Sequence, residues 1–302
     1  MKKCSVIIPT YNGANKILSL IRALSIQTTN DFETIVVVDG SNDDTVQVLE
    51  QNKSLLRELR IINQPNKGRA GARNTGAAYA QCDLLIFFDD DIEPDPDCIQ
   101  QHILHHSTIN ESLMFGKLLM DNRETKNDFY QYRYSNEVRW IEPFGTTNKK
   151  ISFDQFAITT QNMSMSKSIF NSLQGFDERL RDSEDFDLGV RALLKDVPVY
   201  YNPKAFAWHR DFVDISAYMK RQTEYYIAKK ELLKMHPDYL QLLPKHFAFM
   251  QKKSYSKRLI AGLFHYHVFW NYFIHSGLFL KTFPQRLRFR LYEILIFSNS
   301  VL

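Results

Sequence analysis

The chain contains the run Leu84-Leu85-Ile86-Phe87-Phe88-Asp89-Asp90-Asp91, in which five apolar residues lead directly into three carboxylates. A short, continuous apolar run is typical of a strand that is buried on both faces. Residues 6–8 and 35–38 form two similar runs, and each is followed by a segment, 16–27 or 45–59, with apolar side chains at helical spacing. Strands that alternate with helices indicate a parallel sheet. The sequence therefore predicts an α/β protein with a mostly parallel central sheet flanked by helices.

The C-terminal third of the chain has a different character. A chain of 302 residues, 44% of them hydrophobic and 24% charged, is long enough for one large α/β domain and an appendage. From Asp214 onward the pattern is helical and the charges are mostly basic. We therefore expect an α/β domain over residues 1–213 and a helical, basic and aromatic region over residues 214–302. Residues 110–154 show few clear periods, and no structure is predicted for them.

Residues 259–280 contain no Asp, Glu, Lys or Arg and are followed by a basic segment. About 20 residues suffice to span a bilayer as a helix, but three histidines, an asparagine and two glycines interrupt this stretch. Basic flanks and internal aromatic residues favour a segment that lies on an anionic membrane surface. A true membrane span, or packing on the catalytic domain or on a second subunit, are the alternatives.

Charge and cysteine content restrict the function and the compartment. A formal net charge of +4, without a basic block interleaved with aromatic residues in the first two thirds, argues against a nucleic-acid partner. Cys4, Cys82 and Cys98 lack metal-type spacing and lie in or near apolar runs, so they are interpreted as reduced core thiols. The first strand-like run begins too early to leave room for a signal peptide. We expect a cytoplasmic protein, peripheral on the inner face of the cell membrane.

The carboxylates of residues 89–91 suggest a metal site. Three neighbouring carboxylates repel one another unless a cation or hydrogen-bond donors compensate their charge. Carboxylate oxygens suit Mg²⁺ or Mn²⁺, and Mg²⁺ is commonly held by one or two carboxylates together with substrate phosphates. The alternative is a solvated acidic turn.

Six segments of the sequence, in order, resemble the family 2 inverting glycosyltransferases with the GT-A fold. They are Val6-Ile7-Ile8-Pro9-Thr10-Tyr11-Asn12, Val38-Asp39-Gly40-Ser41 with Asp43-Asp44-Thr45, Asn66-Lys67-Gly68-Arg69-Ala70-Gly71-Ala72-Arg73-Asn74, Asp89-Asp90-Asp91 with Pro94, Gly175-Phe176-Asp177-Glu178, and Glu184-Asp185. They cover about the first 210 residues. The resemblance implies a nucleotide-sugar donor, a saccharide or lipid-linked acceptor, and a divalent cation, Mn²⁺ or Mg²⁺, as cofactor.

The resemblance also assigns residues to the donor. The implied donor-binding residues are Pro9, Thr10, Tyr11, Asn12, Asp39, Lys67, Arg73, Asp89 and Asp90. Asp39 would accept a hydrogen bond from the base, commonly uracil, although Val38 stands where the family often has a second acidic residue. The alternative is that Asp39 only caps the following loop. Lys67 and Arg73 lie in a glycine-containing loop that enters a helix, which can offer cations and backbone N–H groups to a diphosphate.

The remaining assignments concern the metal, the base and the acceptor. The resemblance implies Asp91 and Asp89, with His209 after a late strand, as the metal site, and Asp185 as the base. A base is needed because acceptor hydroxyls are poor nucleophiles; the alternative is that Glu184 and Asp185 only favour a helix N-terminus. On the acceptor or sugar side, the implied residues are Asn162, Asp177 and Glu184.

Two other classes of function stay open at this stage. A metal-dependent nucleotidyltransferase would also use paired carboxylates, but it would release pyrophosphate instead of a nucleoside diphosphate. An inactive nucleotide-sugar-binding scaffold at a membrane would keep the fold without the chemistry. The presence of Asp89, Asp91 and Asp185 argues against the inactive scaffold.

Overall fold

The computed structural model describes residues 2–123, 127–152, 159–247, 262, 264, 270, 272–274 and 277–300. The chain divides into two compact units. Unit 1 comprises residues 1–121 and 139–211, and unit 2 comprises residues 122–138 and 212–302. The expected division at residue 213 falls close to the end of unit 1. Residues 122–138 nevertheless belong with the C-terminal helices, which no local sequence pattern indicates.

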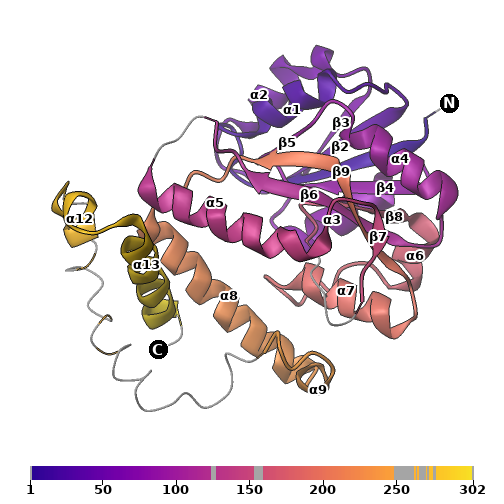
Figure 1. Cartoon of the computed structure of the whole chain (residues 1–302). Coiled ribbons are helices and arrows are strands. Elements are labelled where there is room, and N and C mark those ends of the chain that lie inside the picture. Colours follow the sequence, from indigo (N-terminus) through magenta and orange to yellow (C-terminus); the bar gives the residue numbers. More distant parts are fainter. Residues whose placement is uncertain are drawn as a thin grey trace. The chain divides into compact units, whose positions relative to one another are not determined.

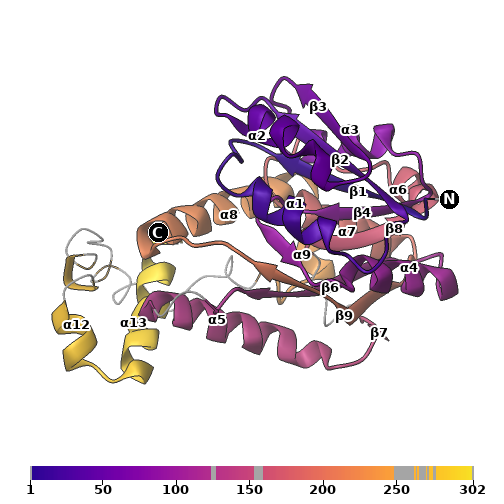
Figure 2. The same cartoon turned by 90° about the horizontal axis from the view of Figure 1, so that it is seen from above.

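Unit 1 is built on one nine-stranded sheet, with the strand order β3-β2-β1-β4-β8-β6-β9-β5 and with β7 paired to β9 (Figures 1 and 2). The strands are β1 (Cys4–Thr10), β2 (Phe32–Asp39), β3 (Leu59–Gln64), β4 (Leu84–Phe88), β5 (Ile92–Pro94), β6 (Leu113–Met120), β7 (Lys149–Lys150), β8 (Asn162–Ser166) and β9 (Val199–His209). The β3-β2-β1-β4 half is parallel, as expected. The other half is mixed, because β8 runs antiparallel to both of its neighbours.

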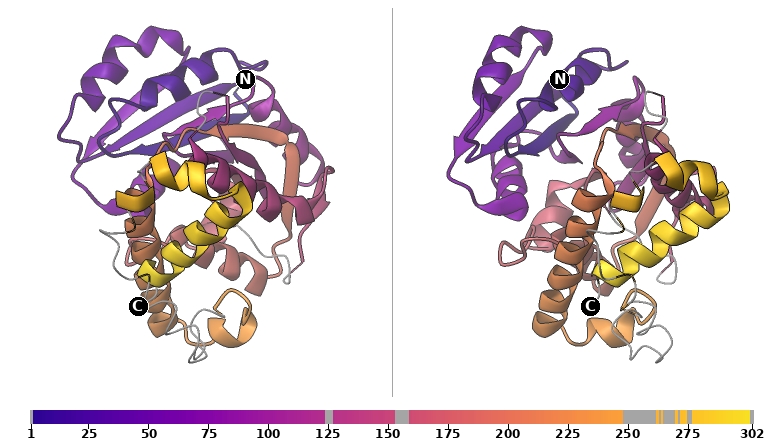
Figure 3. Two further views of the ribbon diagram at one scale, coloured as in Figure 1. Left: turned by 60° about the vertical axis from the view of Figure 1, so that its left-hand side comes forward. Right: turned by 90° about the vertical axis from the view of Figure 1, so that its left-hand side faces the viewer.

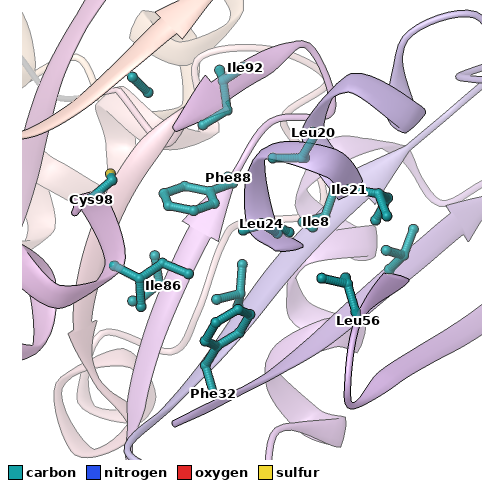
Figure 4. Close-up of a cluster of buried hydrophobic side chains, with 14 of the residues drawn as sticks. Ile8, Leu20, Ile21, Leu24, Phe32, Leu56, Ile86, Phe88, Ile92 and Cys98 are labelled. Atoms are coloured by element: carbon teal, nitrogen blue, oxygen red, sulfur yellow. The ribbon is translucent and has the colours of Figure 1, made fainter. Parts of the chain in front are cut away.

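Helices cover both faces of the parallel half of the sheet. The helices of unit 1 are α1 (Ile17–Ser25), α2 (Thr45–Gln51), α3 (Gly68–Tyr79), α4 (Cys98–Thr108), α6 (Lys167–Ser172) and α7 (Glu184–Leu194), with 3₁₀ turns at Lys53–Leu55 and Glu142–Phe144. Alternate residues of a strand point to opposite faces. In Figure 4 the leucines of α1 lie over Ile8 and Phe88 on one face. On the other face, Phe87 packs against Phe170 and Phe176.

At two positions of the sheet and its covering helix, close packing leaves room only for glycine. In α3, a Cβ built on Gly76 would lie 2.4 Å from the Ile7 side chain of β1. In β6, a Cβ on Gly116 would lie 2.1 Å from the Ala205 carbonyl oxygen, at the point where the register between β6 and β9 shifts. Glycine at position 76 allows α3 to pack directly on the sheet, since a larger side chain would overlap with β1. Glycine at position 116 likewise allows the close approach of β6 and β9 at the bulge.

The carboxyl ends of β1, β2 and β4 meet at one edge of the sheet, because these three strands are parallel and adjacent. Thr10 and Asp39 end their strands, and Asp89 directly follows β4. Ligands of open α/β sheets bind beyond this edge. The topology therefore brings together three of the segments that the sequence assigned to the donor.

Unit 2 consists of helices around an aromatic cluster. It contains most of α5 (Asp128–Ile141), together with α8 (Ile215–Met235), α9 (Tyr239–Leu242), α12 (Gly277–Thr282) and α13 (Gln285–Ser300). Figure 3 shows α13 beside α8. The buried cluster comprises Phe129, Tyr132, Ile215, Met219, Ile274, Phe279, Tyr292 and Leu295. Asp128 accepts hydrogen bonds from Arg288 and Tyr292, which fastens α5 to α13.

The prediction for residues 259–280 lies mostly outside the described residues. Of the positions that are described, Phe264, Trp270, Phe273 and Phe279 pack in or against the aromatic cluster of unit 2, whereas Tyr272 is 81% exposed. Among the described helices, none combines the length and the apolar content needed to cross a bilayer.

Candidate active site

A cleft of about 690 Å³ lies at the carboxyl edge of the parallel strands. The residues that line it come from distant parts of the chain: the end of β1 with Lys16, the end of β2, residues 66–73 at the start of α3, the triplet after β4, and residues 178–182. Among the residues assigned from the sequence, those that line the cleft are Pro9, Thr10, Tyr11, Asp39, Lys67, Arg73, Asp89, Asp90 and Asp91. The assigned residues that do not line it are Asn12, Asn162, Asp177, Glu184, Asp185 and His209.

Asp39 is buried and holds the start of α3. Its carboxylate accepts hydrogen bonds from the backbone N–H groups of Lys67 and Gly68, both at 2.8 Å, and from the Gln64 side chain at 2.7 Å. An ionised carboxylate has about four acceptor sites, so one remains. The sequence left open that Asp39 only caps the loop before Asp43. In the structure Asp39 does bind backbone N–H groups, but those of residues 67–68 at the start of α3. The free acceptor site is compatible with a base N–H.

Asp90 joins the ends of β1 and β4. The Thr10 hydroxyl donates to its Oδ2 at 2.6 Å, and the Lys16 ammonium lies 2.8 Å from its Oδ1. Burial raises the pKa of Asp90 to about 6, and the Lys16 charge opposes this shift. A Cβ on Gly13 would lie 2.1 Å from the Thr10 hydroxyl, so this contact also requires a glycine. Because Thr10 and Lys16 bind both of its oxygens, Asp90 holds the end of β1 next to the end of β4 at the rim of the cleft.

Asn12 connects two loops beside the cleft. Its backbone is left-handed, with a φ of 48°, its N–H donates to the Ser41 hydroxyl at 3.0 Å, and its side-chain oxygen accepts from the Asn42 N–H at 2.9 Å. The neighbouring Tyr11 is 49% exposed and lines the cleft. Asn12 therefore shapes the loop, while Tyr11 offers an aromatic face to a ligand.

Arg73 is 2% exposed and links the triplet to helix α7. One end of its guanidinium lies 2.7 Å from Asp89 Oδ1, and the other lies 2.5 Å from Glu184 Oε1. Glu184 itself is buried. The sequence assigned Arg73 to a diphosphate and Glu184 to the acceptor side; in the structure the two side chains bind each other, and of the two only Arg73 lines the cleft. The bridge brings the first turn of α7 next to the carboxylates that follow β4.

Asp185 lies in the first turn of α7, beside Glu184. Burial of its carboxyl group raises the pKa of Asp185, the negative charge of Glu184 raises it further, and Arg73 opposes both effects. The Phe186 N–H donates to its Oδ1 at 2.7 Å. A carboxylate whose pKa is raised is a better proton acceptor, which is the property that a general base needs.

Asp91 and His209, two of the three residues that the sequence assigned to a metal, lie close together. The His209 Nε2 atom lies 3.6 Å from Asp91 Oδ1, because β5 and β9 pair at residues 92 and 209. Neighbouring ligand atoms around an octahedral ion with bonds of about 2.1 Å are about 3 Å apart, so the pair fits one divalent cation after a small adjustment. Within the described residues, no group of three His, Cys, Asp or Glu side chains surrounds such a position. An ion here would need phosphate or water oxygens as further ligands.

Asn162 was assigned to the acceptor or sugar side, but it is fully buried, so its side chain is not exposed to a ligand. Its side-chain oxygen lies 2.7 Å from His102, and its amide nitrogen donates to the Ala205 carbonyl at 2.9 Å. The histidine continues the network to Ser164, and burial lowers the pKa of His102 to about 3, so its ring is neutral. Asn162 and His102 thus form a buried polar network between α4 and the sheet, and neither side chain lines the cleft.

The loop 177–182 contains site residues that the sequence did not assign. Arg179, Arg181 and Asp182 line the cleft, and Arg69 of α3 donates to Asp182 at 2.5 Å. Asp177, which was assigned to the acceptor, is instead bound by Arg179, with 2.6 Å between Nη2 and Oδ2. This bond lowers the pKa of Asp177. The only signal in the sequence is that acidic and basic residues are mixed along 177–182, and it does not show which side chains pair.

The cleft thus combines carboxylates with cationic side chains. The family model described as "Glycosyl transferase family 2" matches residues 5–173, and the chain belongs to this family. A Haemophilus influenzae "Uncharacterized glycosyltransferase" is 28% identical over 63% of this chain and 61% of its own length. The Staphylococcus aureus poly(ribitol-phosphate) beta-N-acetylglucosaminyltransferase TarP is 28% identical over 57% of this chain and 47% of its own length.

The fold agrees with that family. Residues 1–349 of S. aureus TarS, solved in complex with UDP, superpose with a TM-score of 0.59 at 17% identity, over 99% of this chain and 89% of that one. The expected GT-A fold is thereby confirmed. The chain spans less than two thirds of the length of the two curated relatives named above.

Proposed function

We propose that the chain is an inverting glycosyltransferase that moves a sugar from a nucleotide diphosphate donor, UDP-linked, to an acceptor hydroxyl. The observation that carries this proposal is the Arg73 bridge, because it joins the carboxylates after β4 to the helix that bears Asp185. Membership of the family and the fold shared with a UDP-bound protein support it.

In the proposed reaction, the exposed ring of Tyr11 packs on the donor base, and Asp39 accepts the base N–H with its remaining site. Lys67, which lines the cleft, binds the diphosphate. Asp185 removes the proton of the acceptor hydroxyl as its oxygen attacks the anomeric carbon. Inversion follows because the attack is a single displacement and no enzyme side chain bonds to the sugar.

We also propose a divalent cation, Mn²⁺ or Mg²⁺, held by Asp91 and His209, with Asp89 beside it. Such an ion neutralises the charge that develops on the departing diphosphate. The fit rests on the 3.6 Å between Asp91 and His209 and on the oxygen and imidazole chemistry of the pair.

Replacing Asp91 by Asn is expected to weaken Mn²⁺ binding by about tenfold or more, because a charged ligand is replaced by a neutral one. Electron paramagnetic resonance of free Mn²⁺, titrated with protein and UDP, measures this affinity independently of turnover. Asp95→Asn, outside the cleft lining, is the matched control. Equal Mn²⁺ affinity in the wild type and in Asp91→Asn would remove Asp91 from the metal site.

Product analysis tests the proposed function as a whole. Purified protein is incubated with a panel of nucleotide sugars and Mn²⁺, and the release of nucleoside diphosphate is followed. Release of pyrophosphate from a sugar phosphate and a nucleoside triphosphate would instead identify a nucleotidyltransferase. Donor binding without any release, in the presence of a broad acceptor panel, would identify an inactive scaffold.

Assembly of a polysaccharide, a lipid-linked oligosaccharide or another glycoconjugate is the proposed setting, and the name of the relative TarP supports a polymer acceptor.

We further propose peripheral attachment of unit 2 to the cytoplasmic face of the membrane, because Lys281, Arg286 and Arg290 are exposed on α12 and α13. Flotation with vesicles that contain phosphatidylglycerol should carry the protein upward at low salt; protein that stays at the bottom at every salt concentration would contradict attachment.

A further inference from the structure

The backbone of Gln161 lies beside the carboxylates that follow β4. Gln161 directly precedes β8, which pairs with β4 so that Asn162 lies opposite Phe88. The pairing continues by one residue, because the Asp89 N–H donates to the Gln161 carbonyl at 3.3 Å. The end of the sheet ladder therefore fixes Gln161 next to the triplet 89–91.

The side chain of Gln161 reaches the histidine of the proposed cation site. Its amide nitrogen lies 3.3 Å from His209 Nε2, the same ring nitrogen that lies 3.6 Å from Asp91 Oδ1. An amide nitrogen only donates hydrogen bonds, so the ring nitrogen accepts this one with its lone pair. Gln161 and Asp91 are both half-buried, so a small ion can reach them.

The Gln161 amide has a partner in either of its two orientations. In the structure the Thr159 hydroxyl donates to Gln161 Oε1 at 3.1 Å, which directs the amide nitrogen toward His209. A hydroxyl also accepts hydrogen bonds, so Thr159 can accept from the amide nitrogen after a half-turn that directs Oε1 toward His209. The terminal torsion of glutamine is broad and roughly two-fold, so the half-turn costs little.

A cation on His209 requires the lone pair that now accepts from the amide N–H, so ion binding turns this amide away. Amide oxygens, like carboxylate oxygens, suit Mg²⁺ and Mn²⁺. The separations of 3.3 and 3.6 Å from His209 Nε2 are close to the spacing of about 3 Å between neighbouring ligand atoms of an octahedral ion.

We propose that Gln161 is a third protein ligand of the cation, which it binds through Oε1 together with Asp91 and His209. This inference rests on the proposed function, which places the cation at Asp91 and His209. A glutamine ligand agrees with the finding that, among the described residues, no group of three His, Cys, Asp or Glu side chains surrounds an ion position. The other positions around the ion are left to phosphate and water oxygens.

Mn²⁺ binding by variants of Gln161 tests the proposal. Free Mn²⁺ is followed by electron paramagnetic resonance in titrations with the full chain at a constant UDP concentration. Gln161→Leu should bind Mn²⁺ about threefold or more weakly than the wild type, because a ligand oxygen is lost, and Gln161→Glu should bind it more tightly, because a neutral ligand becomes anionic. Gln47→Leu and Gln47→Glu, at an exposed position of α2 outside the cleft lining, should bind as the wild type does. Thermal unfolding checks that all variants are folded.

The opposite signs expected for the two substitutions distinguish a ligand from a residue that only holds the His209 ring through its N–H. An ionised glutamate cannot donate that hydrogen bond. Weaker Mn²⁺ binding by Gln161→Glu than by the wild type would therefore overturn the proposal, and so would equal affinities of Gln161→Leu and the wild type.

The same titrations separate this proposal from the proposed function. If Asp91→Asn loses Mn²⁺ affinity and the Gln161 variants do not, the cation site stands and Gln161 is not its ligand. A wild type that binds no Mn²⁺ would overturn both. These measurements need no turnover, so a protein that binds Mn²⁺ as expected but releases no diphosphate would count against the transferase and leave the assignment of Gln161 intact.

Discussion

Asp185→Asn should lower kcat for sugar transfer by about 10²–10⁴-fold while UDP affinity stays unchanged, because a general base contributes a factor of this size to proton transfer. Asparagine has nearly the same shape as aspartate but cannot accept the hydroxyl proton. Asp185 does not line the cleft, so its loss should leave donor binding intact. Initial rates of diphosphate release at saturating acceptor, together with calorimetric titration of UDP, measure both quantities.

The pH dependence of kcat in the wild type is a second test of Asp185 as the general base. Burial and the charge of Glu184 raise the pKa of Asp185 above the usual value of a carboxyl group, about 3.9. Because the base must be ionised, kcat should be low below this raised pKa and should increase as the pH passes through it. The residual activity of Asp185→Asn should lack this rise.

Asp83→Asn, an exposed aspartate outside the cleft, controls for the substitution itself and should retain full activity. Substantial transfer by Asp185→Asn would remove Asp185 from its proposed role. A parallel loss of UDP affinity would show instead that the variant disturbs the donor site through Glu184 and Arg73.

The sequence predicted the parallel half of the fold because each of its strands is a local apolar run. Residues 84–88 are buried by neighbours on both faces, so their composition alone identifies a strand, and the carboxylates after them fall at the edge where ligands bind. The mixed half was harder to predict. The strand β6 lies in a segment without clear periods, and its partner β9 follows some 80 residues later, so only tertiary pairing defines it.

The roles of individual polar residues depended on partners that are distant in the sequence. Arg73 matched a diphosphate-binding motif, but the sequence does not show that Glu184, 111 residues further on, binds one end of its guanidinium. Asn162 matched a sugar contact, but His102 of α4, which packs on the sheet, binds its side-chain oxygen. A motif states which residue type stands at a position, whereas burial and hydrogen-bond partners decide what remains available to a ligand.

The buried bridge of Arg73 gives the largest expected effect on stability. Arg73→Met should lower the free energy of unfolding by about 3–5 kcal/mol, because removing one member of a buried ion pair leaves the other charge uncompensated. Here Glu184 is buried and loses its cation, while Asp89 is about one quarter exposed and can be solvated more easily. Chemical denaturation followed by circular dichroism measures the change.

A second substitution separates the bridge from a role in donor binding. In the double variant Arg73→Met with Glu184→Gln, the buried carboxylate is neutral, so part of the lost stability should return, with a coupling of about 0.5–3 kcal/mol typical of residues in contact. Arg57→Met, at an exposed position, should change stability by no more than about 0.5 kcal/mol. If Arg73→Met instead kept wild-type stability and lost UDP affinity, the guanidinium would serve the diphosphate, and the link between Asp89 and helix α7 would not be what holds the base in place.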